Sequence, residues 1–188
     1  AHDSIADQDA SLLGLVVERG RALVVAVNKW DGIASDQRDA IRDGLGLRLG
    51  FLSFAPEIFI SARHGTGVGD LVTAVRSAYD AAMREMPTKE LTRALEQAVV
   101  AHQPPLVRGR RIKLRYAHQG GRNPPVVVIH GNQTQHVPAA YRRYLENYFR
   151  EVFKLRGTPM RIEFRTDENP FAGRRNELTQ RQVRKRQR

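Results

Sequence analysis

Four residues, Asn28-Lys29-Trp30-Asp31, directly follow an apolar run at 22–27 that has the length and composition of a buried strand. Open α/β sheets bind ligands outside the carboxyl ends of their strands, where these polar residues are expected. The two oxygens of the Asp31 carboxylate can accept from the ring N–H and the exocyclic amine of guanine, a pair of donors that adenine does not present. The pattern therefore predicts a guanine-binding loop, in which the Lys29 stem lies along the base.

A second polar segment, Ser61-Ala62-Arg63, ends the next predicted strand, at 57–61. Parallel strands end at one edge of a sheet, so this segment is expected to close over the same base, with a backbone N–H donating to the guanine carbonyl oxygen. The Asn28 side chain can tie the two loops together. The alternative is an ordinary strand-to-loop turn with an exposed aspartate. The predicted nucleotide-binding residues are Asn28, Lys29, Asp31, Ser61 and Ala62.

Residues 1–86 alternate predicted helices, at 9–18, 35–49 and 68–83, with the two strands. This order favours parallel strands joined by helical crossovers, an α/β architecture in which the strand at 22–27 is buried on both faces. The third helix is expected to bury one apolar face. Its residues on that face are Leu71, Val72, Val75, Ala78, Tyr79, Ala82 and Met83.

Pro87 interrupts this pattern, and we place a domain boundary there. Residues 87–173 are predicted to form an α+β domain in the order α-β-β-α-β, and residues 174–188 a basic, disordered tail. The expected elements are helices at 88–102 and 139–155, strands at 112–117, 126–130 and 160–164, and a loop at 120–125.

Charge separates the two halves of this chain of 188 residues. Residues 1–86 hold 9 Lys and Arg against 12 Asp and Glu, whereas residues 87–188 hold 22 against 8. A basic half indicates a polyanionic partner, most often nucleic acid, although a solvated basic surface is the alternative. The basic groups are Arg108, Arg110, Arg111, Lys113 and Arg115, then Arg142 and Arg143, then the tail with Arg174, Arg175, Arg181, Arg184, Lys185, Arg186 and Arg188.

The absence of cysteine excludes thiolate metal sites, cysteine nucleophiles and disulfides, and it is compatible with a reducing cytoplasm. No run of 18 apolar residues occurs, so no membrane contact is expected. His102, His118, His130 and His136 do not have metal-ligand spacing, and no metal site is expected in this chain.

Longer stretches of the sequence resemble the Der family, also called EngA, of bacterial tandem GTPases that act in ribosome assembly. The resemblance implies two GTPase domains followed by a KH-like domain, GTP hydrolysis with Mg²⁺, and a cytoplasmic role on the large ribosomal subunit and its rRNA, without DNA. The matching stretches are Asp7-Gln8-Asp9, Ala26 to Asp31, Pro104-Pro105, Arg111 to Ala117, Ile129 to Asn132, Leu155 to Pro159, and Asn169-Pro170-Phe171.

Two departures from this family limit what the chain is expected to do. No G-x-x-x-x-G-K-[ST] loop exists to cradle phosphates, and Asp43-Gly44-Leu45-Gly46 is a chance match to the Asp-x-x-Gly motif. The chain is therefore expected to be a C-terminal fragment with part of the second GTPase domain. It would hold no catalytic residue, would be inactive alone, and would have the missing N-terminal GTPase domains as partners.

The basic half also lacks a Gly-x-x-Gly clamp between Leu106 and Gly173. Either it binds RNA by charge and other surfaces, or it docks on the GTPase domains. The alternative for the whole chain is a non-enzymatic RNA- or ribosome-binding module with a remnant α/β scaffold.

Overall fold

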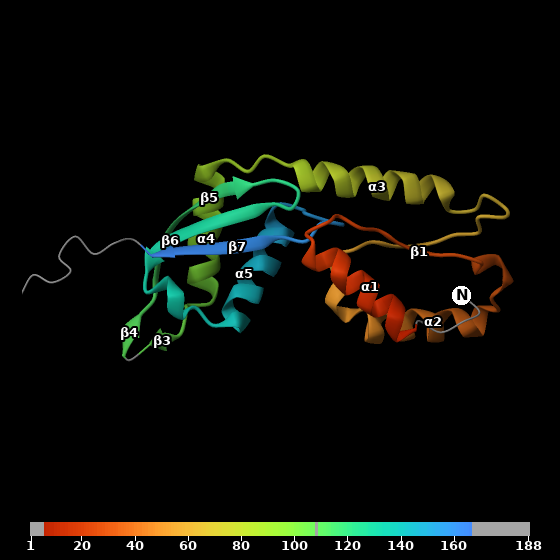
Figure 1. The fold of residues 1–188 in the computed structure, drawn as a ribbon, viewed down its shortest axis with the longest axis horizontal. Coiled ribbons are helices and arrows are strands. Elements are labelled where there is room, and N and C mark those ends of the chain that lie inside the picture. The colour runs from red at the N-terminus through yellow and green to blue at the C-terminus, as the bar shows by residue number, and fades with distance from the viewer. Residues whose placement is uncertain (1–5, 108, 167–188) are drawn as a thin grey trace, which may run out of the picture.

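A computed structural model describes residues 6–107 and 109–166, and the predicted tail lies outside these ranges. Two parts follow one another along the chain, as Figure 1 shows. The first part contains α1 (Asp7–Glu18), β1 (Val25–Val27), α2 (Ser35–Arg48), β2 (Glu57–Phe59) and α3 (Val68–Met83). The second contains α4 (Thr88–Ala101), β3 (Leu106–Val107), β4 (Arg110–Arg111), β5 (Lys113–Gly121), β6 (Val126–Asn132), α5 (Ala139–Val152) and β7 (Arg161–Thr166).

Parallel strands β1 and β2 form the centre of the first part, with Val25 opposite Glu57. Helices α1 and α2 lie on one side of this pair and α3 on the other (Figure 1). Leu45, Leu49 and Leu52 form the core between α2 and the strands, and residues of α1 pack against them. The predicted α/β order is confirmed, with β1 three residues shorter than the apolar run at 22–27.

Burial of the first part is less complete than the sequence predicted. The prediction that the strand at 22–27 is buried on both faces is wrong for one face. Ala26 is exposed, and Val25 and Val27 on either side of it are half-buried. The predicted apolar face of α3 is also only partly covered, with Val72 and Tyr79 49% and 61% exposed. Apolar periodicity indicates which face of an element tends to be buried. It does not indicate whether residues 6–107 and 109–166 include the segment that buries that face.

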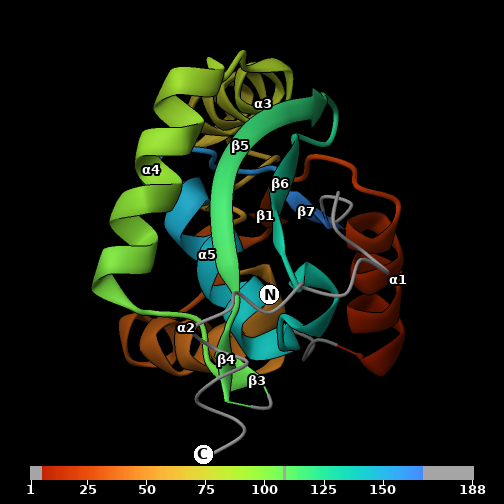
Figure 2. The same cartoon turned by 90° about the vertical axis from the view of Figure 1, so that its left-hand side faces the viewer.

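Strands β5, β6 and β7 form the sheet of the second part, with β5 antiparallel and β7 parallel to the central β6. Helices α4 and α5 cover one face of this sheet in both views (Figures 1 and 2). Its core includes Leu91 and Leu95 of α4, Ile129 of β6, and Leu145 and Phe149 of α5, each at most 1% exposed. The predicted order α-β-β-α-β is confirmed, with the small β3–β4 hairpin as an addition.

The predicted loop at 120–125 begins too early, because β5 continues through Gly121. A Cβ on Gly120 would lie 2.6 Å from Cγ2 of Val128. Gly120 therefore allows close packing within the strand and does not end it.

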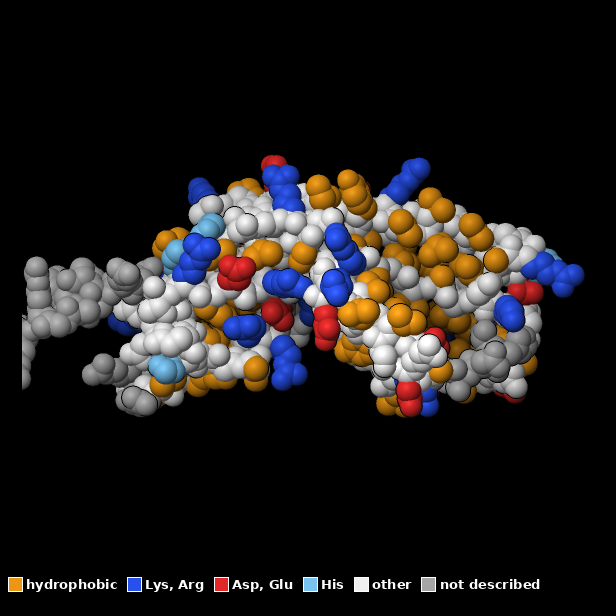
Figure 3. Space-filling model, in the orientation of Figure 1, with side chains coloured by type: hydrophobic (Ala, Val, Ile, Leu, Met, Phe, Trp, Pro, Cys, Tyr) orange, Lys and Arg blue, Asp and Glu red, His pale blue; other side chains and the backbone are white. Residues whose placement is uncertain are grey.

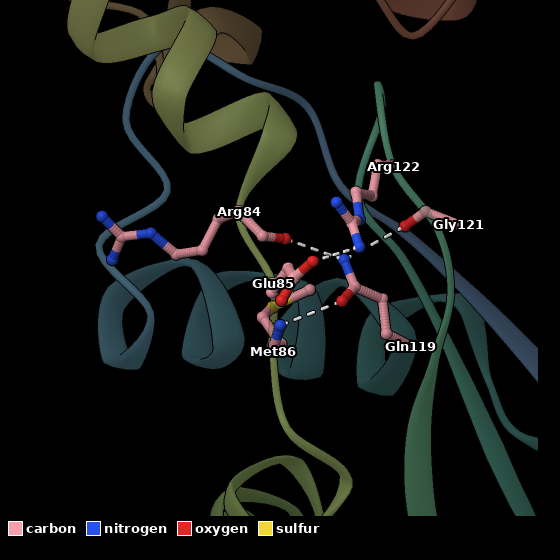
Figure 4. A network of polar contacts seen from close by, with 6 residues as sticks. All are labelled: Arg84, Glu85, Met86, Gln119, Gly121 and Arg122. Atoms are coloured by element: carbon pink, nitrogen blue, oxygen red, sulfur yellow. Dashed lines mark hydrogen bonds and ion pairs between the residues drawn. The ribbon is translucent and has the colours of Figure 1, made fainter.

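The side chain of Gln119 joins the β5–β6 hairpin to the segment between α3 and α4 (Figure 4). Its Nε2 donates to the Arg84 carbonyl at 2.9 Å, and its Oε1 accepts from the Met86 N–H at 2.9 Å. Arg122 and Glu85 form an ion pair beside it. We call this arrangement the linker clamp; it fixes the point where the chain passes from one part to the other.

Gly157 makes a second connection between the parts. Its N–H donates to the Phe54 carbonyl at 2.8 Å, and its carbonyl accepts from the Leu23 N–H at 2.8 Å. Its φ is +74°, and a Cβ there would overlap Ala78 of α3. Only glycine allows this close approach between the loop after α5 and the first part. No helix within the described ranges is long and apolar enough to cross a membrane.

Candidate functional site

The two predicted loops meet at the carboxyl ends of β1 and β2. The strands are parallel and in register, so Asn28 and Ile60 follow them at the same edge. The Ile60 N–H donates to the Val27 carbonyl at 2.9 Å, and the Trp30 N–H donates to the Ile60 carbonyl at 3.1 Å. Each loop is therefore held by the backbone of the other.

Asn28 ties the loops together, as the sequence predicted. Its Oδ1 accepts from the N–H of Lys29 at 2.8 Å and from the N–H of Ala62 at 3.1 Å. Donation from a backbone N–H of this loop to guanine stays a prediction. The Ala62 N–H already has an acceptor, so it serves loop geometry in this state.

Asp31 presents an exposed carboxylate at this edge. A hydrogen bond from the Ser61 side chain is the main reason that the pKa of Asp31 is lowered, followed by a backbone hydrogen bond and then by His64 and Arg63. The Asp31 Oδ2 lies 3.3 Å from Nε2 of His64. The hydrogen bonds and the nearby His64 and Arg63 all favour the ionised carboxylate. This is the form that can accept from a pair of guanine donors.

Ser61 differs from the other predicted residues because it is only 2% exposed. Its N–H donates to the Thr66 carbonyl at 2.9 Å, and its hydroxyl accepts from the His64 N–H at 3.3 Å. Gly67 follows this turn with a φ of +73°, and a Cβ there would lie 2.5 Å from the Phe59 carbonyl oxygen. The backbone hydrogen bond between Ser61 and Thr66 closes this turn, and Gly67 packs it against the end of β2. In this position the Ser61 side chain bonds to Asp31.

Trp30 packs against β2 and α2. Its ring centroid lies 4.3 Å from that of Phe59 on β2. The guanidinium groups of Arg38 and Arg42 in α2 lie 5.5 and 5.4 Å from the Trp30 centroid. These contacts orient the loop from behind and leave the neighbouring Lys29 and Asp31 exposed.

All five predicted nucleotide-binding residues therefore lie at one edge of the β1–β2 sheet. Sequence reasoning missed His64, whose contact with Asp31 depends on the turn made by Gly65 and Gly67. Asp43-Gly44-Leu45-Gly46 lies inside α2, so it forms no loop. Among the described residues, no group of three or more His, Cys, Asp or Glu side chains could hold a metal ion.

The predicted basic groups lie apart in the second part. Arg111, Lys113 and Arg115 are exposed on β4 and β5, and Arg142 and Arg143 are exposed on α5. The Arg142 guanidinium lies 5.4 Å from the Phe164 ring centroid. Arg108, the Arg110 side chain and the tail fall outside what the structure describes.

Comparison with known proteins defines the class of the second part. Residues 85–165 match the KH-domain-like family of EngA bacterial GTPase enzymes, C-terminal. This agrees with the sheet order and with the helices on one face.

The whole chain is similar to proteins named GTPase Der. It is 62% identical to the one from Thioalkalivibrio sulfidiphilus, 58% to the one from Methylococcus capsulatus and 56% to the one from Hahella chejuensis, in each case over 188 residues. All of this chain is covered, against 40%, 41% and 40% of these relatives. The resemblance to the Der (EngA) family is confirmed, and the chain spans about two fifths of the length of these relatives.

Proposed function

We propose that this chain is part of a GTP-binding, GTP-hydrolysing protein that acts in assembly of the large ribosomal subunit in the cytoplasm. Residues 1–86 would be the guanine-recognition half of a P-loop GTPase domain, residues 87–173 a KH-like domain, and residues 174–188 a basic tail. The observation that supports this most directly is the joining of the Asn28–Asp31 loop to the Ser61–Ala62 loop at one sheet edge.

The residues at this edge fit a guanine base. The Asp31 carboxylate is exposed and its pKa is lowered, so it is an ionised acceptor at neutral pH. Lys29 beside it is exposed and has a φ of +62°. GTP or GDP would need phosphate and Mg²⁺ ligands from residues outside this chain, because the sequence has no phosphate-cradling loop. Hydrolysis by the 188-residue chain alone is not expected.

Exposed apolar surface on the first part supports a larger GTPase domain. Space-filling Figure 3 shows hydrophobic side chains gathered over this part of the molecule. They include Leu12 and Leu15 of α1 and Val72, Val75 and Tyr79 of α3, each at least 48% exposed. We propose that further polypeptide of the same protein, including its GTPase domains, covers this surface.

The basic second half supports an RNA partner in the ribosome. We propose that rRNA phosphates contact this half and the tail. Deletion of residues 174–188 is expected to weaken rRNA binding and to flatten its salt dependence, because up to seven cations are lost. Filter binding at several salt concentrations measures this, and an unchanged salt slope would count against a role for the tail.

Nuclear magnetic resonance titration of this chain with GMP, compared with AMP, tests recognition of the base, because the two ligands carry the same phosphate and differ only in the base. GMP is expected to shift the amide resonances of the Asn28–Asp31 and Ser61–His64 loops, and AMP is expected to leave them unchanged. Asp31→Ala should abolish the GMP response, whereas Asp80→Ala, an exposed carboxylate on α3, should preserve it. Equal responses to GMP and AMP, or persistence in Asp31→Ala, would contradict guanine recognition here.

The second candidate is a non-enzymatic RNA- or ribosome-binding module whose α/β part is a scaffold. The contacts of Gly157 with Phe54 and Leu23 favour it, because they join the first part to the loop after α5. RNA binding in the absence of any GMP response would select this function.

A further inference from the structure

The face of the β5–β6–β7 sheet opposite α4 and α5 has an ordered group of rings. Ala117, Val127 and Ile129 belong to the core under the helices. Side chains alternate along a strand, so Tyr116, His118 and His130 point to the other face. We call this other face the open sheet face, since no helix within the described ranges covers it (Figures 1 and 2).

The three rings of the open sheet face contact one another across strands. Tyr116 and His130 are paired in register, and their rings are stacked with centroids 4.4 Å apart and planes 6° apart. The His118 ring lies 5.2 Å from the His130 ring and 6.4 Å from the Tyr116 ring. Tyr116 is 41% exposed, so part of this group is open to a ligand. Mutual packing limits ring motion and lowers the entropy lost on binding.

Two cations, one on β7 and one on β5, lie near these rings. Arg165 of β7 is paired with His130. Arg161 is paired with Val126 farther along the sheet, and its guanidinium donates to the Glu18 carbonyl. Lys113 lies at the start of β5 and is paired with Asn132, two residues after His130 on β6. All three basic residues are exposed, and Glu163 is the one acidic residue of β7. In Figure 3, Lys, Arg and His side chains are visible on this side of the second part.

We propose that the open sheet face binds single-stranded RNA, with an unpaired base against the Tyr116–His130–His118 rings and phosphates near Lys113 and Arg165. Stacked rings bordered by cations match the two parts of a nucleotide, the flat base and the charged phosphate. Only unpaired bases expose their faces, so a single strand is favoured over a duplex. This proposal rests on the proposed RNA contact of the second part and gives it a location.

A protein partner fits the open sheet face less well. Among the described residues of the second part, the exposed large hydrophobic side chains are Val100, Leu106, Tyr116 and Val152, and of these only Tyr116 lies on a strand of the β5–β6–β7 sheet. The face therefore offers rings and cations but no aliphatic anchor of the kind that stabilises most protein interfaces.

Fluorescence anisotropy with a labelled RNA octanucleotide of sequence CACACACA tests the proposal on the 188-residue chain. Tyr116→Ala is expected to weaken binding about 5- to 100-fold, the effect of removing one stacking partner. Tyr79→Ala, which removes an exposed tyrosine from α3, is the matched control and should bind as the unsubstituted chain does. Tyr116→Phe keeps the ring and should restore binding, which separates stacking from a folding defect.

Resonances of the imidazole groups provide a second readout that needs no substitution. The RNA is expected to shift the His118 and His130 ring signals and to leave His102, which packs against Tyr144 beside the helices, unchanged. Equal binding by Tyr116→Ala and Tyr79→Ala, with unchanged His118 and His130 signals, would overturn the open sheet face as the site while RNA binding itself stood. No RNA binding by the unsubstituted chain would overturn the proposed RNA contact and this site together.

Discussion

Ser61 is the residue on which the electrostatics of the candidate base site depend most. It is buried, and its side chain bonds to the exposed Asp31 carboxylate. A buried serine under the loop thus lowers the pKa of the acceptor and holds it in place from the side away from solvent.

Ser61→Ala is expected to raise the pKa of Asp31 towards its ordinary value of 3.8, because the largest cause of the lowered pKa is removed. An aspartate with a lowered folded pKa stabilises the fold above its unfolded pKa and loses that contribution as the pH falls through the folded pKa. In the variant this contribution should be smaller, and Asp31 should become protonated at higher pH in the folded chain. Carboxyl-carbon titration by nuclear magnetic resonance measures this. Ser77→Ala, at an exposed serine of α3, should leave the Asp31 titration unchanged.

Gly67 is the residue that closes the second loop. Gly67→Ala is expected to lower the free energy of unfolding by about 2 kcal/mol or more, since a Cβ meets the Phe59 carbonyl oxygen and the left-handed backbone disfavours alanine. Gly69→Ala, two residues away in α3 with nothing near its Cβ, should stabilise by about 0.5–1 kcal/mol. Urea denaturation of both variants gives the comparison, and equal effects would contradict the proposed clash.

At the scale of elements, α5 is joined to the end of α4 by a tyrosine hydroxyl. The Tyr141 hydroxyl donates to the His102 carbonyl at 2.7 Å, and burial raises the pKa of Tyr141 to about 12. The neutral hydroxyl is therefore the form that the fold requires, and it is the form that can donate to this carbonyl.

Tyr141→Phe is expected to lower the free energy of unfolding by about 1 kcal/mol near neutral pH, because the His102 carbonyl loses its donor. A raised tyrosine pKa gives stability that is full below the unfolded pKa of about 10 and is lost as the pH rises towards 12. The unsubstituted chain should therefore lose stability over this range more steeply than Tyr141→Phe. Denaturation at pH 9 and pH 11.5 measures the difference, with the exposed Tyr79→Phe as control.

The order of elements could be predicted from the sequence, because apolar runs, prolines and helix periodicity are local signals. The loop Asn28–Asp31 was predictable for the same reason, since its chemistry lies in adjacent residues after a strand. The His64 contact with Asp31 and the stacking of Tyr116 on His130 were not predictable. The first depends on a turn, and the second on the register of two strands, which the hairpin and the β5 bulges determine.

At the scale of the whole molecule, the linker clamp and Gly157 make the two parts depend on each other. Ala81 and Met86, at the end of α3 and just after it, also belong to the core of the second part. The α3 helix therefore runs from the candidate base site at its start to the KH-like core at its end.

Gln119→Leu is expected to lower the free energy of unfolding by about 2 kcal/mol, because the Met86 N–H and the Arg84 carbonyl lose their partners. It should also separate the unfolding transitions of the two parts, which are expected to coincide in the unsubstituted chain. Trp30, the single tryptophan, reports the first part by fluorescence, and the His118 and His130 ring signals report the second. Gln97→Leu, an exposed glutamine on α4, should keep the transitions together. Separate transitions in the unsubstituted chain would contradict the coupling.

The contacts between the two parts limit how their coding segments can be exchanged by recombination between genes. A recombination event that joined residues 87–166 to a different preceding domain would remove Ala81 and Met86 from the core of the second part, and would leave Gly157 without Phe54 and Leu23. A recombination point near Pro87 therefore falls at the boundary between two sequence patterns. It nevertheless divides residues that pack together in one structure. The smallest segment that can be exchanged between genes without repairing this junction contains both parts.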